Sequence, residues 1–509
     1  MAATKNSDYP KESPRKTSKG KISVLDTTLR DGDQAPGVHL NAEKKLLIAR
    51  RLDEIGVDII EAGTPVASVE EAKAVKAIAN EGLRAEVMGF CRLMRKDIDS
   101  AADCGVSRIA LVFPSSDLHI KEKLRVKRSE ALPLVLDSLD YAKGRGLLVE
   151  LVAEDGSRAD PAFLAKVFSE GAKAGADRLC VCDTVGAWSP EKSFWLFDFL
   201  SKKVSKPVGV HCHNDLGLAV ANTLAAVRAG ASEVHVTVNG MGERTGNAAL
   251  EEVAVGLKLL YGIDTVKLGG LFALSEFVKA TSGFAPARNK PVVGENAFSH
   301  ESGIHVDGIV KNPATYEGLK PELVGRKRRI VMGKLSGRKA VGLKLAEFEL
   351  RASEEQLEKI VGRIKEAGDK GKTVSDADFL AIAESVLNGI PRERVKIDEL
   401  VCRTGNKIKP SATVKVTVQL NGKKLHASGK GTGDGPVDAA LNAIYDALGG
   451  SEAKLTEYRV EAITGGTDAF VDVKVKLRKG DREIGSGAVG TDIVMASVDA
   501  VIKGLNALL

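Results

Sequence analysis

Aromatic residues, cysteine pairs and long apolar runs are all scarce in this sequence of 509 residues. Aromatics make up only 4% of it, and 74 basic side chains stand against 68 acidic ones, so the basic stripe with interleaved aromatics that is typical of nucleic-acid-binding proteins is missing. Six cysteines without a CxxC pair argue against a disulfide framework and indicate free thiols in a reducing compartment. No run approaches the roughly 18 apolar residues that a membrane span needs. We therefore expect a cytoplasmic protein that binds neither nucleic acid nor membranes.

The N-terminal segment, residues 1–21, carries much of the net charge of +6, with six Lys or Arg side chains against Asp8 and Glu12. It lacks the apolar stretch of a secretory signal. A transit peptide is the weaker alternative, because acidic residues are present and lysine outnumbers arginine. We expect this segment to be a disordered tail.

From residue 22 onward, short runs rich in valine and isoleucine alternate with stretches whose apolar residues recur at helical spacing. The runs lie roughly 25 to 40 residues apart, the length of a βα unit. There are eight of them: Ile22–Leu25, Ile59–Glu61, Glu86–Phe90, Arg108–Phe113, Leu147–Val152, Leu179–Cys182, Val208–His211 and Glu233–Val238. Eight βα units predict an α/β protein that opens with a (β/α)8 TIM barrel over residues 22–270. An open, doubly wound sheet is the alternative, but no GxGxxG follows the first run.

The rest of the chain has two further parts. Residues 271–390 have a mainly helical pattern and are expected to form a linker region. Residues 391–509 contain an internal repeat, Ala412–Leu448 and Ala469–Leu508, in which each copy shows an alternating strand, a turn, a glycine-rich loop and a helix. We expect a C-terminal αβ regulatory domain of two ββα repeats.

Polar residues follow every predicted barrel strand, and the C-terminal ends of these strands form the active-site face of such a barrel. The sharpest signal is His211 and His213, which point to the same face of a strand because they lie two residues apart. With an aspartate from another strand they would form a metal site of two histidines and one carboxylate with open positions. Two imidazoles held by polar neighbours without a metal are the alternative.

Arg30 and Asp31 follow the first strand, and Gly32 permits the turn that lets both side chains point inward. Asp31 could then bind metal while Arg30 faces the substrate and stabilises an enolate or a carboxylate. A surface ion pair is the alternative. Glu154 could pair with Arg30 or orient a water, Thr184 could donate a hydrogen bond to a substrate carboxylate, and His119 is a further candidate for substrate binding.

Four segments, DTTLRDGDQ, VHCHND, NGMGERTGNA and ENAFSHESGIHVDG, resemble the family of 2-isopropylmalate, citramalate and homocitrate synthases. The resemblance extends from about residue 22 to the C-terminus, and the repeated module resembles the family's allosteric domain. It implies metal ligation by Asp31, His211 and His213, with Asn247 ligating or nearby. It also implies that Arg30 stabilises the enolate and that Glu154 and Thr184 contact the 2-oxo acid.

The same resemblance implies catalytic roles for His305 and Tyr316, which in the family reach the active site of a neighbouring subunit of a homodimer. It implies acetyl-CoA as co-substrate and a divalent Mg, Mn or Zn ion. Asp33 departs from the glutamate that the family more often has at this position, which puts the local hydrogen bonding near Arg30 in question.

The expected reaction is an acyl transfer in branched-chain amino-acid biosynthesis. The metal polarises a 2-oxo acid, a base removes a proton from the acetyl-CoA methyl group, the enolate attacks C2, and water hydrolyses the thioester. LVFPSSDLH and CVCDTVG resemble archaeal-type citramalate synthases more than isopropylmalate synthases. This resemblance implies pyruvate as the acceptor and citramalate as the product, in preference to 3-methyl-2-oxobutanoate and 2-isopropylmalate. A homocitrate synthase, a lyase on the same barrel and a non-catalytic amino-acid sensor are the remaining alternatives.

The glycine-rich loops of the C-terminal repeat are the expected effector site. Paired loops at equivalent positions favour a backbone that approaches a ligand closely, although plain turns are the alternative. The candidate residues for binding isoleucine or leucine are Gly433, Gly435, Asp468 and Gly487.

Overall fold

The computed structural model describes residues 21–370, 374–387, 394–420, 423–450, 453–462 and 469–508. The chain divides into two compact units. The first extends to Phe298 and also includes Leu319–Lys327, and the second comprises Ser299–Gly318 and the chain from Arg328 onward. None of the helices in the described ranges is long and apolar enough to cross a membrane. The predicted tail and Asp468 fall outside these ranges.

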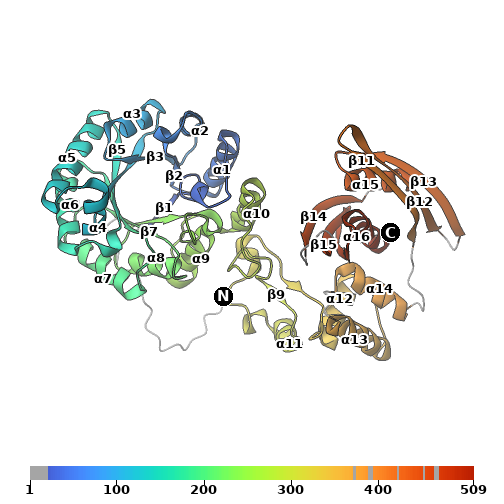
Figure 1. Cartoon of the computed structure of the whole chain (residues 1–509). Helices are drawn as coiled ribbons and strands as arrows, with labels where there is room; N and C mark the ends of the chain where they lie inside the picture. The colour runs from blue at the N-terminus through green and yellow to red at the C-terminus, as the bar shows by residue number, and fades with distance from the viewer. Residues whose placement is uncertain are drawn as a thin grey trace. The chain divides into compact units, whose positions relative to one another are not determined.

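The first unit contains a closed barrel of eight parallel strands in sequence order (Figure 1). The strands are β1 (Ser23–Asp26), β2 (Ile59–Gly63), β3 (Glu86–Arg92), β4 (Arg108–Pro114), β5 (Leu148–Glu154), β6 (Arg178–Asp183), β7 (Val208–Cys212) and β8 (Glu233–Val236). The pairing of β1 with β8, which places Ser23 opposite Glu233, closes the barrel. Closure confirms the predicted TIM barrel and excludes the open sheet.

Helices surround this barrel. They are α1 (Ala42–Ile55), α2 (Val69–Ala79), α3 (Arg95–Asp103), α4 (Asp117–His119), α5 (Arg128–Gly144), α6 (Pro161–Lys173), α7 (Pro190–Ser201), α8 (Ala219–Arg228), α9 (Leu250–Tyr261) and α10 (Leu271–Ser282). Local sequence sets their ends. Asn41 accepts a hydrogen bond from the Lys44 N–H at the start of α1, and Gly56 ends that helix in the left-handed conformation with φ 89°.

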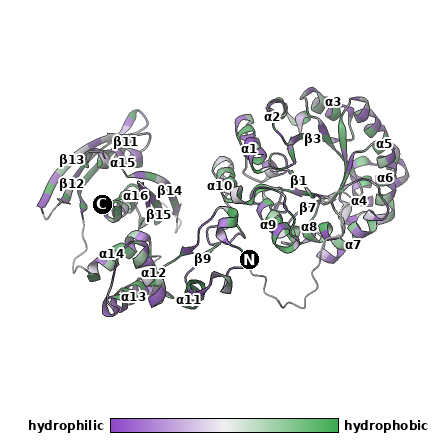
Figure 2. Cartoon of the chain, turned by 180° about the vertical axis from the view of Figure 1, so that it is seen from behind, coloured by the Kyte–Doolittle hydropathy of each residue, from purple (hydrophilic) through white to green (hydrophobic). Residues whose placement is uncertain are grey.

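Two apolar layers hold the barrel together. The larger layer lies between the strands and the helices, where apolar faces of both meet (Figure 2). The smaller layer fills the interior with Leu25, Ile59, Met88, Ala110, Val152 and Cys180. Because alternate residues of a strand point to opposite faces, these six side chains close the barrel below its mouth. The open space is therefore confined to the C-terminal ends of the strands.

The second unit begins with a mainly helical region. It contains β9 (Ser299–His300), α11 (Gly303–Lys311), β10 (Arg329–Ile330), α12 (Arg338–Glu347), α13 (Glu354–Asp369) and α14 (Asp376–Leu387). A core that includes Val306, Met332, Val341, Ile360 and Phe379 joins these helices. The observed pattern agrees with the helical region predicted to follow the barrel.

Two similar αβ modules follow, and their presence confirms the predicted internal repeat. The first contains β11 (Val395–Gly405), β12 (Ile408–Leu420), β13 (Lys423–Thr432) and α15 (Pro436–Ala447). The second contains β14 (Lys454–Ala462), β15 (Val471–Lys479), β16 (Arg482–Gly490) and α16 (Ile493–Leu508). Each copy therefore has three antiparallel strands before its helix, one more than the predicted ββα unit. The Asn421–Gly422 turn lies outside the described residues.

The additional strands escaped the sequence pattern for a physical reason. The ladder shifts register between Ile397 and Glu399 in β11, and again between Leu455 and Glu457 in β14. Such a bulge breaks the alternation of apolar and polar residues by which a strand is recognised. The two shifts lie near the start of the first strand in both copies, which strengthens the internal symmetry.

Candidate metal centre and catalytic pocket

A pocket opens at the C-terminal ends of the barrel strands, where the polar residues were predicted to meet. Its apolar lining is Phe90, Ala110, Val112 and Val152. Its polar lining is Arg30, Asp31, Gln34, Glu61, Glu154, Cys182, Thr184, His211, His213, His235, Glu243 and Arg244. Six of the predicted site residues, Arg30, Asp31, Glu154, Thr184, His211 and His213, are therefore brought together here.

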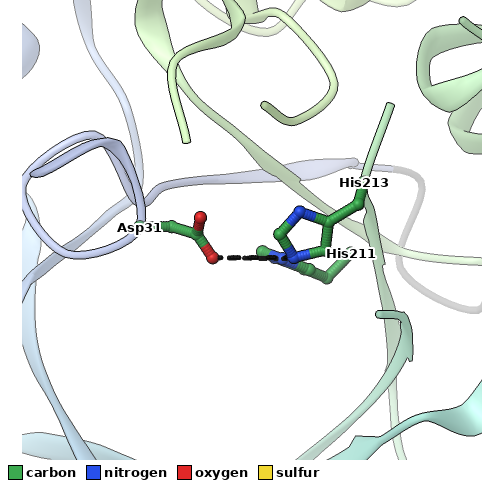
Figure 3. Close-up of side chains that lie close together, drawn as sticks. All are labelled: Asp31, His211 and His213. Carbon is green, nitrogen blue, oxygen red and sulfur yellow. Dashed lines mark hydrogen bonds and ion pairs between the residues drawn. The ribbon is translucent and has the colours of Figure 1, made fainter. Parts of the chain in front are cut away.

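Asp31, His211 and His213 point toward one another from two elements (Figure 3). Asp31 Oδ2 lies 3.6 Å from His211 Nε2 and 3.8 Å from His213 Nε2, and the two nitrogens are 3.4 Å apart. A point roughly 2.1 Å from all three atoms lies within this triangle, the usual length of metal bonds to imidazole nitrogen and carboxylate oxygen. All three residues are buried, so the donor set fits a divalent cation.

Burial and charge set the protonation of these three side chains. Burial alone raises the pKa of the Asp31 carboxyl, but the neighbouring Arg30 guanidinium outweighs it, with help from the Asn247 hydrogen bond, and holds that pKa well below its usual range. Burial and the neighbouring His213 lower the pKa of His211, and burial lowers that of His213. The site therefore offers one carboxylate and two neutral imidazoles, the forms that bind metal ions.

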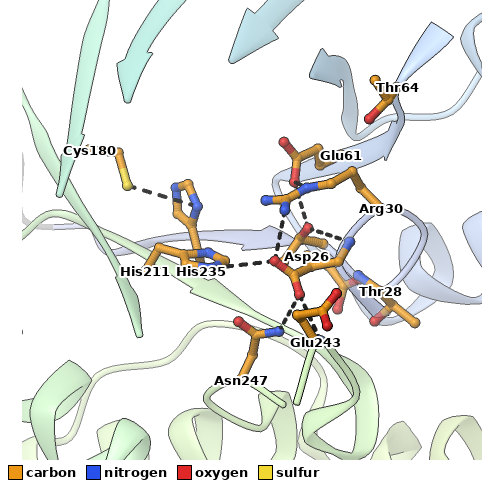
Figure 4. A network of polar contacts seen from close by, with 12 residues as sticks. Asp26, Thr28, Arg30, Glu61, Thr64, Cys180, His211, His235, Glu243 and Asn247 are labelled. Carbon is orange, nitrogen blue, oxygen red and sulfur yellow. Dashed lines mark hydrogen bonds and ion pairs between the residues drawn. The ribbon is translucent and has the colours of Figure 1, made fainter. Parts of the chain in front are cut away.

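Asn247 lies beside this triad and holds Asp31 in place (Figure 4). Its Nδ2 donates to Asp31 Oδ1 at 3.0 Å and to the Met241 carbonyl at 3.1 Å. Its Oδ1 is buried without a hydrogen-bond partner. Asn247 thus anchors the Asp31 carboxylate and has an amide oxygen without a hydrogen-bond partner. This fits the expectation that Asn247 ligates the metal or lies next to it.

Arg30 is fixed in the pocket by two carboxylates. Its Nε donates to Glu61 Oε2 at 2.7 Å (Figure 4) and its Nη1 to Asp31 Oδ2 at 2.7 Å. The guanidinium lies 4.9 Å from the centre of the Phe90 ring. Burial lowers the pKa of Arg30, but Glu61 and Asp31 together raise it above the ordinary value. A permanently charged, pre-positioned guanidinium suits stabilisation of a developing negative charge.

Sequence reasoning did not identify the carboxylate that pairs with Arg30. Glu154 was considered as that partner, but Glu61 takes the place, and Glu154 forms an ion pair with Lys123 at 2.5 Å. Glu61 also accepts from the Thr27 hydroxyl at 2.5 Å. It directly follows the apolar pair that opens β2, and a carboxylate inside a buried strand was the available signal.

The two remaining predicted residues of the barrel, Thr184 and His119, have different surroundings. Thr184 lines the pocket and accepts a hydrogen bond from the Asp155 N–H at 2.8 Å. His119 is absent from the pocket lining that the structure describes, and lies between two carboxylates, 3.5 Å from Glu154 and 3.6 Å from Asp155. A role of His119 in substrate binding stays a prediction.

His305 and Tyr316 belong to the second compact unit. Their rings stack with centroids 4.2 Å apart and an angle of 27° between the planes. A Cβ at Gly308 would meet the Tyr316 ring at 2.5 Å, so this glycine lets the tyrosine lie against α11. Both rings are exposed to solvent. The structure therefore pairs the two rings, and their catalytic role stays a prediction.

A second buried cluster lies below the triad, and it too escaped sequence reasoning. His235 Nε2 is 3.2 Å from Glu150 and 3.4 Å from Glu233, and its Nδ1 is 3.9 Å from Cys180 Sγ. Burial lowers the pKa of His235, but the two carboxylates raise it to about 10. Since both ring nitrogens of His235 face other groups, the cluster has the form of a buried ion-pair network that reaches the pocket through His235.

The glycines proposed for effector binding have mixed surroundings. A Cβ at Gly433 would meet Asp438 Oδ2 at 2.4 Å, and one at Gly487 would meet the Val473 carbonyl at 3.0 Å, whereas the space around Gly435 is open. The atoms that lie closest to Gly433 and Gly487 therefore belong to the module itself. A ligand at these loops stays a prediction.

Three family models match successive parts of the chain. Residues 21–278 match the HMGL-like family, residues 292–372 match the homocitrate synthase post-HMGL domain-like family, and residues 373–509 match the LeuA allosteric (dimerisation) domain. Together they cover the barrel, the helical region and the repeated module.

Similar proteins point the same way. The "(R)-citramalate synthase CimA" of Methanocaldococcus jannaschii is 51% identical over 490 residues, which are 96% of this chain and 99% of that protein. A Methanopyrus kandleri protein named "Probable 2-isopropylmalate synthase" is 48% identical over 494 residues, 96% of this chain and 98% of that protein. The solved structure of the Bacillus subtilis HMG-CoA lyase is 21% identical with a TM-score of 0.48, and covers 53% of this chain and 96% of its own. The chain belongs to the family of 2-isopropylmalate, (R)-citramalate and homocitrate synthases.

Proposed function

We propose that this protein is an (R)-citramalate synthase that joins acetyl-CoA to pyruvate and then hydrolyses the thioester. The observation that carries the proposal is the pocket in which Asp31, His211 and His213 converge beside the fixed charge of Arg30. The similarity to the M. jannaschii citramalate synthase over nearly the whole of both chains supports it.

The apolar wall of the pocket supports pyruvate as the acceptor. Phe90, Val112 and Val152 are among the residues that line the pocket. These bulky side chains favour the methyl group of pyruvate over the isopropyl group of 3-methyl-2-oxobutanoate. One methylene in such a pocket is worth only about 1–3 kcal/mol, so the preference rests on a few side chains.

The residues of the pocket divide the chemistry among them. A divalent Mg, Mn or Zn ion held by Asp31, His211 and His213 would polarise the keto group of the acceptor. Thr184 donates to the acceptor carboxylate, and Arg30 stabilises the negative charge that develops during the attack of the acetyl-CoA enolate on C2. Glu154 lines the same pocket and contacts the acceptor.

The base for the acetyl-CoA methyl group comes, in this proposal, from the second unit. His305 takes the proton and the stacked Tyr316 orients its ring. As the family resemblance implies, the pair reaches the pocket of the neighbouring subunit in a homodimer, and the match to the LeuA dimerisation domain supports dimerisation. Isoleucine or leucine is the proposed effector of that domain. The cytoplasmic location stays a prediction.

The test is the release of CoA thiol from acetyl-CoA by the purified chain with Mg²⁺ or Mn²⁺. Pyruvate, 3-methyl-2-oxobutanoate and 2-oxoglutarate are offered separately, and a metal chelator provides the blank. The fastest release is expected with pyruvate. The 2-isopropylmalate synthase alternative, which the M. kandleri relative supports, predicts the fastest release with 3-methyl-2-oxobutanoate.

A further inference from the structure

Five consecutive loops at the barrel mouth are joined by polar contacts. Ser116 after β4 donates its hydroxyl to Asp155 after β5, and the Asp155 N–H donates to Thr184 after β6. Arg244 after β8 donates to the Thr184 carbonyl at 2.7 Å and binds Asp215 after β7 through two bonds of 2.8 Å. Within this series Asp155 links Ser116 to Thr184.

Asp155 is unusual in three respects. Its backbone is left-handed, with φ 61° and ψ 32°, which is uncommon for a residue other than glycine. Its side chain is fully buried, yet it is not among the residues that line the pocket. Its carboxylate is instead occupied by Ser116, by Arg158 at 2.8 Å and by His119 at 3.6 Å. The energy of the left-handed turn is therefore offset by a set of buried contacts.

The turn at Asp155 decides what its neighbours present to the pocket. Glu154, one residue earlier, lines the pocket, while the Asp155 N–H points at Thr184 Oγ1. A threonine hydroxyl has one hydrogen to donate. Because Oγ1 accepts from Asp155, this hydrogen stays free to donate into the pocket, toward an acceptor such as a carboxylate.

We propose that Asp155 is a positioning residue that holds the Thr184 hydroxyl as a donor to the carboxylate of the 2-oxo acid. Ser116 and Arg158 serve this role by fixing the Asp155 side chain, and His119 supports it from the side of Glu154. The inference rests on the proposed function, since it assigns a carboxylate as the group that Thr184 binds.

The test is a double-mutant cycle of Asp155→Ala and Thr184→Val, read by the KM for each substrate. Each single change should raise the KM for the 2-oxo acid about tenfold, the cost of one hydrogen bond to a charged group, and leave the KM for acetyl-CoA within about twofold. The KM of the double variant for the 2-oxo acid should be no higher than that of the single variant with the larger effect. Asp155→Asn, which tolerates the left-handed turn and keeps the N–H, should recover most of the loss.

Two results would overturn the proposal. Effects that multiply in the double variant would show that Asp155 acts independently of Thr184. Equal rises in KM for both substrates would show a merely structural role. If Asp155→Ala does not fold, Ser116→Ala and Arg158→Gln remove its partners instead, and both must raise the KM for the 2-oxo acid selectively.

Direct binding separates this proposal from the proposed function. If the wild type turns over none of the three acids, the proposed function fails, and titration calorimetry of the Mn²⁺-loaded protein with each acid takes the place of KM. The positioning role is supported if Asp155→Ala and Thr184→Val each bind the acid about tenfold more weakly. In the double variant the two losses of affinity should again not multiply. Equal affinity for wild type and variants, or no binding at all, contradicts it.

Discussion

At the scale of single residues, Asp31 is the residue that connects the polar groups of the pocket. Its carboxylate faces His211 and His213, pairs with Arg30 at 2.7 Å and accepts from Asn247 at 3.0 Å. Residues from β1, β7 and β8 and the loops that follow them thus converge on one group. A change to any imidazole of the triad should act on metal binding before it acts on folding.

The first prediction concerns His213. His213→Ala should remove metal-dependent thiol release, because two donors on one face of β7 are reduced to one. Metal content of the dialysed protein and the rate of thiol release measure the effect. His39→Ala is the matched control, because His39 is exposed and does not line the pocket. Full activity of His213→Ala would refute the ligand assignment.

The second prediction concerns Asp26, a fully buried carboxyl at the end of β1 whose Oδ2 has no hydrogen-bond partner. Burial raises its pKa from the ordinary 3.8 to about 7. The stability gained by holding the proton is fully present below about pH 4 and is lost as the pH rises through about 7. Relative to the wild type, Asp26→Asn should therefore gain a few kcal/mol between pH 5 and pH 8. Urea unfolding of both proteins at the two pH values measures this, and parallel pH profiles would contradict it.

Sequence reasoning located the residues that local pattern can reveal. Arg30, Asp31, His211 and His213 were found because their spacing at a strand end fixes where they point. Glu61, His235 and Asp155 were not assigned roles, because their partners lie on other strands. A contact such as that between His235 and Glu150, 85 residues apart, depends on barrel closure, which no local window shows.

At the scale of elements, a buried lysine joins the loop that carries Arg30 to two helices. Lys45 of α1 has a side chain only 1% exposed, and it binds Asp33 at 3.0 Å and Glu71 of α2 at 2.8 Å. Asp33 also accepts from the Leu40 N–H at 2.9 Å. The shorter side chain at position 33 is thus satisfied by Lys45 and the loop backbone, and the bonds of Arg30 are made by Glu61 and Asp31.

The third prediction follows from this ion-pair cluster. Lys45→Met should lower the free energy of unfolding by about 3 kcal/mol, because it leaves two carboxylates facing each other without their cation. Arg50→Met on the same helix is the control, since its pair with Glu81 is exposed and should contribute nothing measurable. Urea unfolding followed by circular dichroism compares them. Equal losses for both variants would show that burial of Lys45 is unimportant.

At the scale of the whole molecule, the chain combines a barrel with a repeated module that matches the LeuA allosteric (dimerisation) domain. The described part of α14 contributes Ala377 and Leu380 to the core of the repeated module. Deleting residues 392–509 should abolish inhibition by the effector, but it would also uncover these side chains. A point change within the module is therefore a cleaner test.

The fourth prediction uses Gly433 for this purpose. A Cβ there would meet Asp438 Oδ2 at 2.4 Å and the Ala439 nitrogen at 2.6 Å, so Gly433→Ala must displace the start of α15. Inhibition by isoleucine or leucine should weaken while the uninhibited rate is retained. Gly362→Ala in α13, where the space is open, should leave inhibition intact. Unchanged inhibition of Gly433→Ala would place the effector elsewhere.

We propose above all that the barrel pocket condenses acetyl-CoA with pyruvate. The most direct measurement is the ratio of kcat/KM for pyruvate to that for 3-methyl-2-oxobutanoate, with free CoA and the product acid quantified together. We expect a ratio of about tenfold or more and one citramalate for each CoA released. A ratio below one would make the protein a 2-isopropylmalate synthase, and no CoA release with either acid would contradict a condensing function altogether.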